Sequence, residues 1–261
     1  MSEYLIPVGE RDVERMDAMC QVFNSFSLEL LSKYPAKTVL DVGCGNGGLT
    51  KAYARAHPEI NIIGMDSSKD QLDVAQRNLP ENIMLILGDV RNLPNNMGQF
   101  DLVHSRFVLT HLEDPVKVAE ELLKLVKPGG VLIMEEAAGG IVNFSKEHRA
   151  AQAWVKAFQT QHILQKSTLH TAELLVKRFP QAKVFPCVGK FDTPQKKLVM
   201  LEGVKMSVSI LPKIKIPDEL NPMVTFNYTG EDWIRDSEEL INDPEFTFEM
   251  NPKAIVVQAS I

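Results

Sequence analysis

The stretch TVLDVGCGNGGLT, residues 38–50, joins an apolar segment, an acid and a glycine-dense turn directly before an amphipathic segment. Its apolar residues predict a strand buried on both faces at about 38–42, followed by a helix from about Leu49. The glycines at 43, 45, 47 and 48 permit positive φ and let backbone N–H groups approach a ligand, which the N-terminal dipole of the helix also favours. The turn therefore predicts a binding site for a nucleoside-like ligand.

The glycines leave two cofactor classes open. Gly43, Gly45 and Gly48 fit the dinucleotide pattern GxGxxG, and Asp66 could bind a ribose hydroxyl as in nicotinamide-binding folds. Two further acids, Asp41 before the first glycine and Asp89 in ILGDVRNLP, would repel a pyrophosphate. A cofactor with an amino group, a ribose diol and an adenine amine suits them better, because carboxylates accept hydrogen bonds from each of these groups.

Five motifs along the chain resemble, in the same order, those of the class I S-adenosylmethionine-dependent methyltransferases. Two segments, YLIPVGERDVERMD near the start and SRFVLTHLEDP, are also similar to a bacterial branch of small-molecule methyltransferases. The five are DVGCGNG (41–47), GMDSS (64–68), GDV (88–90), FDLVHSRFVLTHLEDP (100–115) and KPGG (127–130). The resemblance covers about residues 38–136. It implies methyl transfer from S-adenosyl-L-methionine, with S-adenosyl-L-homocysteine as the product.

The same resemblance implies cofactor-binding roles for individual residues. The methionine part of the cofactor would be lined by Asp41, Gly43, Cys44, Gly45, Ser105 and Arg106. Asp66 would bind the ribose hydroxyls, and Met65 and Ser67 would lie beside the adenine. Asp89 and the Val90 N–H would form hydrogen bonds with the adenine ring. Arg15 would pair with the methionine carboxylate, and Tyr4 would cover it.

Alternating strand and helix patterns predict an α/β fold, a three-layer sandwich with a doubly wound, mostly parallel sheet. Strands are expected near 38–42, 61–65, 83–88, 100–104, 131–136, 183–188 and 254–260, and helices near 12–32, 48–56, 69–77, 114–126, 146–161, 171–179 and 231–241. The resemblance adds that the seven-stranded sheet has an antiparallel last strand. We expect a single domain over 1–261, with an N-terminal helical cap (1–35), a cofactor-binding half (36–137) and an acceptor-side half (138–261).

A segment of over 60 residues, 189–253, separates the last two strands, where the fold needs only a hairpin. It carries a run of apolar residues at 195–211. Insertions beside the carboxyl ends of strands often cover a ligand crevice, which would make the segment a lid and imply an acceptor with an apolar body. Extension of the core and a dimer contact remain the alternatives, because apolar stripes are commonly packing surfaces.

The acceptor chemistry is narrowed mainly by what the sequence lacks. A general base, if one is used, could be His111, Glu135 or Glu136, although His111 also fits a local structural role at a helix start. HSRF follows the fourth strand in place of a [DN]PP[YF] tetrad, and neither HExxH nor CxxC occurs. We therefore expect metal-independent transfer to oxygen, nitrogen or carbon of a small molecule.

Composition excludes several classes of partner. The net charge of −6 does not favour binding to nucleic acid. We interpret the lysines at 196, 197, 205, 213 and 215 as solvated side chains. No apolar run is long enough to span a bilayer, and three widely spaced cysteines fit a reducing compartment. We expect a cytoplasmic monomer or homodimer. Two other functions stay open: an NAD(P)-dependent oxidoreductase and a non-catalytic S-adenosylmethionine-binding adaptor.

Overall fold

Strand β1 (Thr38–Val42) lies inside a seven-stranded sheet, between β2 and β4, with its apolar side chains buried on both faces. The computed structural model describes residues 12–94, 97–139 and 142–260. The sheet order is β3-β2-β1-β4-β5-β10-β7, in which β1 to β5 are parallel and β10 runs antiparallel to both β5 and β7. The predicted fold class, with its antiparallel last strand, is confirmed.

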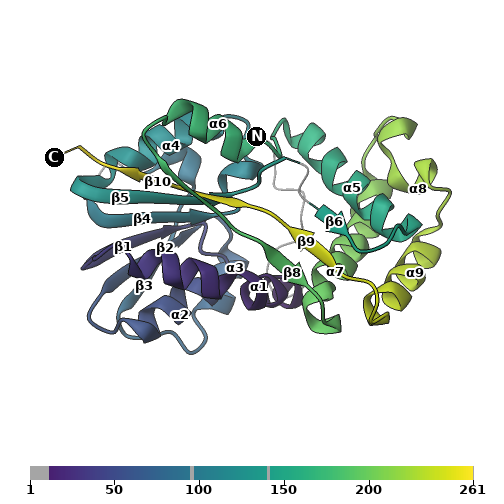
Figure 1. Cartoon of the computed structure of the whole chain (residues 1–261), viewed down its shortest axis with the longest axis horizontal. Helices are drawn as coiled ribbons and strands as arrows, with labels where there is room; N and C mark the ends of the chain where they lie inside the picture. Colours follow the sequence, from purple (N-terminus) through teal and green to yellow (C-terminus); the bar gives the residue numbers. More distant parts are fainter. Residues whose placement is uncertain (1–11, 95–96, 140–141, 261) are drawn as a thin grey trace.

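The strands of this sheet alternate with helices that cover both of its faces (Figure 1). Helices α1 and α2 pack on one face and α4 and α6 on the other, and each face has its own apolar core. The remaining elements of this half are β2 (Asn61–Asp66), β3 (Ile83–Leu87), β4 (Phe100–Arg106), β5 (Val126–Glu136), β7 (Lys183–Pro186), β10 (Lys253–Gln258), α1 (Val13–Ser32), α2 (Gly48–Ala56), α3 (Lys69–Ala75), α4 (Pro115–Lys124), α6 (Thr171–Arg178) and the short 3-10 turns η2 (Val90–Asn92) and η3 (Leu109–His111).

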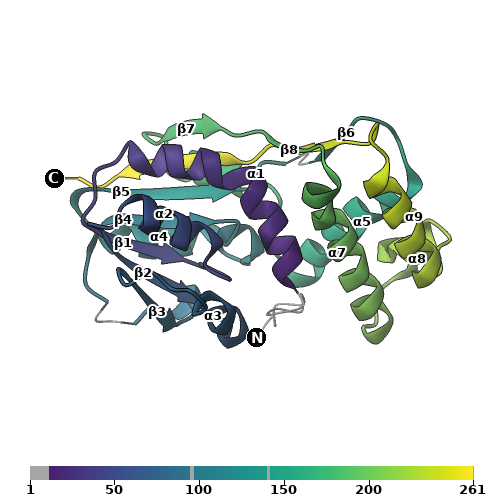
Figure 2. The same ribbon diagram turned by 90° about the horizontal axis from the view of Figure 1, so that it is seen from below.

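Beyond the ends of the strands lies a mainly helical unit with its own core (Figures 1 and 2). It contains α5 (Arg149–Gln165), α7 (Pro194–Ile210), η4 (Leu211–Lys213), η5 (Asp218–Leu220), α8 (Pro222–Thr225), α9 (Gly230–Asn242) and a small sheet of β6 (Val142–Phe144), β9 (Phe248–Met250) and β8 (Gly189–Phe191). The indole N–H of Trp233 donates to the Ala150 carbonyl inside this core, at 3.2 Å. We call this part the helical unit; the sequence did not predict its three-stranded sheet.

Helix α1 connects the two parts. It packs against α2 on the sheet side and against α7 and β8 on the other side, and Figure 2 shows it running from the sheet toward α7. Phe23 on this helix is fully buried, with its ring 5.3 Å from that of Phe107 and 6.0 Å from that of Phe191. The insert 189–253 therefore contributes to a core that includes α1.

Several predicted boundaries need correction. The fifth strand begins at Val126, five residues earlier than expected, because Val126 already pairs with Phe100 before the register shifts. Helix α5 begins at Arg149, after His148 accepts the Ala150 N–H, and runs on to Gln165. Lys197 is not solvated: it is 1% exposed, and its Nζ donates to the carbonyls of Asp243 and Phe246.

Candidate functional site

A cavity of about 380 Å³ opens at the carboxyl ends of β1, β2 and β4, and α1 forms one of its walls. We call it the strand-end cavity. Ten of the twelve predicted cofactor-binding residues line it: Arg15, Asp41, Gly43, Cys44, Gly45, Asp66, Ser67, Asp89, Val90 and Arg106. Residues from four of the five motifs, together with Arg15 of α1, are thus brought to one site, as the parallel strand order requires.

The glycine turn forms the floor of this cavity. Gly43 has φ +66°, and a Cβ atom there would lie 2.3 Å from Cγ2 of Val108, so that only glycine fits. The Gly43 and Cys44 N–H groups donate to the Met65 carbonyl, which ties the turn to the end of β2. Cys44 is buried, and burial followed by the charges of Asp41 and Asp66 raises the pKa of its thiol, so it acts as a small packing residue.

Asp66 lies at the end of β2 and is held by backbone donors. Its two carboxylate oxygens accept the N–H groups of Gly45 and Ser68, each at 2.8 Å. Burial raises the pKa of Asp66, while these hydrogen bonds oppose the rise. Each oxygen has a further lone pair, so the carboxylate can accept hydrogen bonds from a ligand in the cavity.

Asp89 follows β3 and begins the turn η2. Its side chain accepts the N–H of Arg91 and forms an ion pair with the Arg91 guanidinium at 2.5 Å, and these hydrogen bonds lower the pKa of Asp89. Val90 next to it is buried in the cavity wall. A ligand amine that approached Asp89 would compete with Arg91 for the carboxylate.

A buried charge network borders the cavity and is centred on His104, a residue that no sequence pattern indicated. Its Nδ1 lies 2.8 Å from Asp41 Oδ1 and its Nε2 lies 2.9 Å from Glu135 Oε1. Burial disfavours charge on the ring, but hydrogen bonds and charge from both carboxylates outweigh it and raise the pKa of His104 to about 9. The protonated imidazole thus bridges an acid of β1 and an acid of β5, next to the glycine turn.

The network extends to α1 through Ser27 and Arg106. Ser27 Oγ donates to Glu135 Oε2 at 2.9 Å, and Arg106 Nη1 donates to Ser27 Oγ at 3.0 Å. Arg106 also lines the strand-end cavity, where its positive charge favours an anionic ligand group. Thr50 Oγ1 donates to the second oxygen of Asp41 at 2.5 Å, so both oxygens of this acid are engaged.

Three sequence-predicted residues do not face the cavity. Ser105 is fully buried and donates only a long bond of 3.5 Å to Glu136, so its predicted cofactor contact is not supported. Glu136 accepts the backbone N–H groups of Val108, Leu109 and Thr110 and thereby caps η3, and Glu135 belongs to the network under the cavity. Neither glutamate is placed to act as a general base on a ligand. Tyr4 lies outside the described residues.

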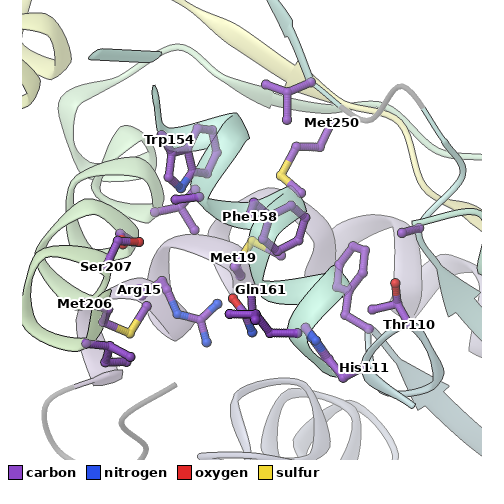
Figure 3. A pocket seen from close by; sticks show the side chains of 18 of the residues that line it. Arg15, Met19, Thr110, His111, Trp154, Phe158, Gln161, Met206, Ser207 and Met250 are labelled. Atoms are coloured by element: carbon purple, nitrogen blue, oxygen red, sulfur yellow. The ribbon is translucent and has the colours of Figure 1, made fainter. Parts of the chain in front are cut away.

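A second, mostly apolar cavity of about 130 Å³ adjoins the first and is lined mainly by the helical unit and α1 (Figure 3). We call it the apolar chamber. Its walls include Met19, Trp154, Phe158, Met206 and Met250, and none of these residues was predicted individually. Four residues line both cavities: Arg15, Met19, Phe107 and His111. The two cavities therefore share a wall.

His111 lies at this shared wall, but its environment keeps it neutral. Its ring stacks on that of His162, with 5.5 Å between the centroids. Burial, followed by the positive charges that His162 and Arg15 can carry, lowers the pKa of His111 to about 3. A neutral imidazole of such low basicity can accept a hydrogen bond and orient a ligand, and it is a poor general base at neutral pH.

The described parts of the chain contain no group of three or more His, Cys, Asp or Glu residues that could hold a metal ion. Within the same ranges, no helix has both the length and the hydropathy needed to cross a membrane.

Comparison with known proteins places residues 40–134 in a family described as a methyltransferase domain. An uncharacterised methyltransferase of Schizosaccharomyces pombe is 38% identical over 40% of this chain and 42% of its own length. A trans-aconitate 2-methyltransferase of Deinococcus radiodurans is 28% identical over 62% of each chain. The chain thus spans less than two thirds of these relatives.

The fold is also similar to that of a solved structure, a phosphoethanolamine N-methyltransferase of Haemonchus contortus in complex with S-adenosylhomocysteine. The TM-score is 0.53 at 17% identity, covering 91% of this chain and 53% of that one. The sheet order, the glycine turn and the family match agree. Residues 40–134 thus match the methyltransferase-domain family, and the chain shares its fold with this solved methyltransferase.

Proposed function

We propose that the protein transfers a methyl group from S-adenosylmethionine to a small-molecule acceptor without a metal ion. The observation that carries this proposal is the pair of adjoining cavities, one polar at the strand ends and one apolar, with a common wall. A transfer enzyme needs two such sites in contact, because the acceptor atom must meet the reactive carbon in line.

The residues of the strand-end cavity fit the parts of this cofactor. Asp66 would bind the ribose hydroxyls, Asp89 and the Val90 N–H would address the adenine, and Arg106 would meet the methionine carboxylate. The backbone of Gly43, Cys44 and Gly45, with Met65 and Ser67 nearby, would line the remainder, and the negative network around Asp41 favours an amino group. The cofactor supplies an electrophilic methyl group on a sulfonium.

The alternative of a nicotinamide dinucleotide is disfavoured by the same acids. Asp41 and Asp66 are both largely buried at the glycine turn, where a pyrophosphate would have to bind. Two carboxylates near a diphosphate repel it strongly in a site of low polarity. A non-catalytic adaptor is tested by turnover of methyl-labelled cofactor with a fractionated metabolite extract, which an adaptor would not support.

Cofactor binding and acceptor binding are assigned to different parts of the chain, according to which cavity each part lines. We assign cofactor binding to 36–137 and the acceptor side to the helical unit within 138–261, together with the cap of 1–35, while α6, β7 and β10 complete the sheet. The insert 189–253 lines the apolar chamber through α7 and also builds the core of the helical unit. A cytoplasmic location and a monomeric or homodimeric state stay predictions.

Binding of S-adenosylhomocysteine tests the cofactor assignment. We expect calorimetry to show binding by the native protein and its loss in Asp66→Ala, because the ribose loses its acceptor. Asp70→Ala removes an exposed acid four residues away, outside the cavity lining, and should bind normally. Circular dichroism of both variants controls for folding, and undiminished binding by a folded Asp66→Ala protein would contradict the ribose assignment.

A further inference from the structure

Two glutamines of α5 connect the apolar chamber with the strand-end cavity. Gln161 lines the chamber, and Gln165 lines the strand-end cavity. The Gln161 Nε2 donates to the Gln165 Oε1 at 3.4 Å, and Gln165 is buried. Because the two residues lie four positions apart on one helix, their side chains lie on the same face of α5. This amide pair therefore extends from one cavity to the other.

Gln161 gives the chamber an uncharged group that can both donate and accept hydrogen bonds. An amide has two N–H donors and an oxygen with two lone pairs, so the bond to Gln165 leaves capacity for a ligand. The lining hydroxyls of Thr110 and Ser207 offer less, because each already donates to a backbone carbonyl. Figure 3 shows the Arg15 guanidinium pointing toward Gln161, so the amide lies beside the shared wall.

The charge of Arg15 at this wall is balanced. Its Nε and Nη2 donate to the two carboxylate oxygens of Asp12, at 2.5 and 2.8 Å, and Asp12 is buried. Burial and nearby positive charge lower the pKa of His111 to about 3, so that this ring is neutral as well. Over the described ranges Arg15 is the one Lys, Arg, Asp or Glu of the chamber lining, and its pair with Asp12 leaves the chamber without net charge. The predicted pairing of Arg15 with a methionine carboxylate would have to compete with Asp12.

An ion of either sign would bind poorly in such a chamber. It would give up its hydration on entering a mostly apolar space whose described lining holds only a charge that is already paired. An ammonium could lie against the rings of Trp154 and Phe158, but cation–π attraction recovers only part of the lost hydration. An uncharged polar group loses less hydration, and the Gln161 amide can replace the hydrogen bonds that it gives up.

We propose that the apolar chamber binds an uncharged acceptor, about one ring in size, whose polar group forms hydrogen bonds with Gln161 at the shared wall. This inference rests on the proposed methyl transfer and specifies the charge and the orientation of its acceptor. The Gln161–Gln165 pair directs the polar group toward the strand-end cavity, where the methyl donor would bind.

The volume of the chamber limits the apolar body of the acceptor. The chamber holds about 130 Å³, close to the roughly 150 Å³ of an engineered apolar cavity that binds benzene. One ring, or an aliphatic group of that size, fits among the thioethers and aromatic rings of the wall. Met19, Met206 and Met250 can adjust to its shape, because methionine is flexible and polarizable.

Three probes with the same ring and different charges test the proposal at neutral pH: benzamide, which is uncharged, benzoate, which is an anion, and benzylamine, which is a cation. Binding to the native protein saturated with S-adenosylhomocysteine is measured by calorimetry. We expect benzamide to bind at least about tenfold more tightly than either ion, because a buried charge without a counter-charge costs more than a buried amide that is hydrogen-bonded.

Gln161→Met tests the position of the polar group. Methionine has a similar size and no amide, so we expect benzamide to bind at least about fivefold more weakly, while toluene, which has no polar group, keeps its affinity within about twofold. Gln159→Met changes an exposed glutamine of the same helix outside both linings and should leave the binding of both probes unchanged. Equal weakening of benzamide and toluene, or unchanged benzamide binding, would overturn the contact with Gln161.

The outcomes separate this inference from the proposed function. Failure of S-adenosylhomocysteine to bind the native protein would overturn the methyl-transfer proposal itself. Normal binding of S-adenosylhomocysteine, with benzoate or benzylamine bound as tightly as benzamide or with no probe bound, would overturn the uncharged acceptor alone.

Discussion

His104 should remain protonated well above neutral pH, and the folded protein should lose stability as this proton leaves. Its ring lies between Asp41 and Glu135, 2.8 and 2.9 Å from their oxygens, and it is 1% exposed. These two carboxylates raise the pKa of His104 to about 9 against the opposing effect of burial. In the unfolded chain the same side chain has a pKa of about 6.5.

The size and sign of the effect follow from these two values. Below pH 6.5 both states hold the proton, and the contribution to the free energy of unfolding is fully present. Between pH 6.5 and 9 the unfolded chain gives up the proton while the folded protein keeps it, so the contribution decreases as pH rises. At about 1.36 kcal/mol for each pKa unit, the full loss is about 3 kcal/mol.

Urea unfolding between pH 6.5 and 9, together with NMR titration of the imidazole rings, measures both quantities. Glu136, whose pKa burial raises to about 7, also lowers stability as pH rises, but mainly below pH 7. Burial also raises the pKa values of the thiols of Cys20, Cys44 and Cys187, which lowers stability toward pH 9, so the range from about 7 to 8 reports on His104. His104→Gln identifies the resonance, and His170→Gln is the control, since that ring is 69% exposed.

Two results would refute this reasoning. The first is a His104 ring that titrates near 6.5 or is neutral at pH 7, which would mean that burial outweighs the two carboxylates. The second is a free energy of unfolding that stays constant or rises between pH 7 and 9.

Three further predictions concern the glycine turn, the chamber and the helical unit. Gly43→Ala should lower the unfolding free energy by about 1–3 kcal/mol or more and weaken S-adenosylhomocysteine binding, whereas Gly98→Ala, also at positive φ but with open space around its Cβ, should cost only backbone strain and leave binding intact. Ala157→Leu should fill the apolar chamber and abolish turnover of methyl-labelled cofactor with a metabolite extract; unchanged turnover would place the acceptor elsewhere. Trp233→Phe should destabilise the protein by about 1–3 kcal/mol in urea unfolding, because the buried Ala150 carbonyl loses its donor; an unchanged midpoint would contradict this.

The cofactor half could be predicted because its signals are local in sequence. The glycine turn and the acids at 66 and 89 each lie directly after a strand pattern, and a parallel sheet brings such ends together. His104 was missed although it lies inside a quoted motif. Its partners are 63 residues earlier and 31 residues later, and only the strand register, which pairs residue 104 with Asp41, reveals the network.

The helical unit was less predictable for a physical reason. Its strands β6, β8 and β9 have three residues each, too few for an alternating pattern. Strand β9 also pairs with strands far away in sequence, with β6 from residues 142–144 and with β8 from residues 189–191. Lys197 looked like part of a solvated run, yet its Nζ is buried between two carbonyls. The apolar run at 195–211 indicated burial without indicating the partner, and only the folded chain shows that α1 and α9 pack on it.

Helix α1 contributes residues to both the strand-end cavity and the apolar chamber. Arg15, Met19, Phe23 and Ser27 follow one another at intervals of four residues and so form a single ridge along the helix. The first two line both cavities, Phe23 packs on Phe107 and Phe191, and Ser27 donates to Glu135 in the charge network. One rigid ridge therefore contacts both cavities, the core of the helical unit and the charge network around His104. In-line transfer tolerates little misplacement of the two reactants. A single helix that contacts both cavities fixes the position of one cavity relative to the other, and so helps to align the reactants that they would hold.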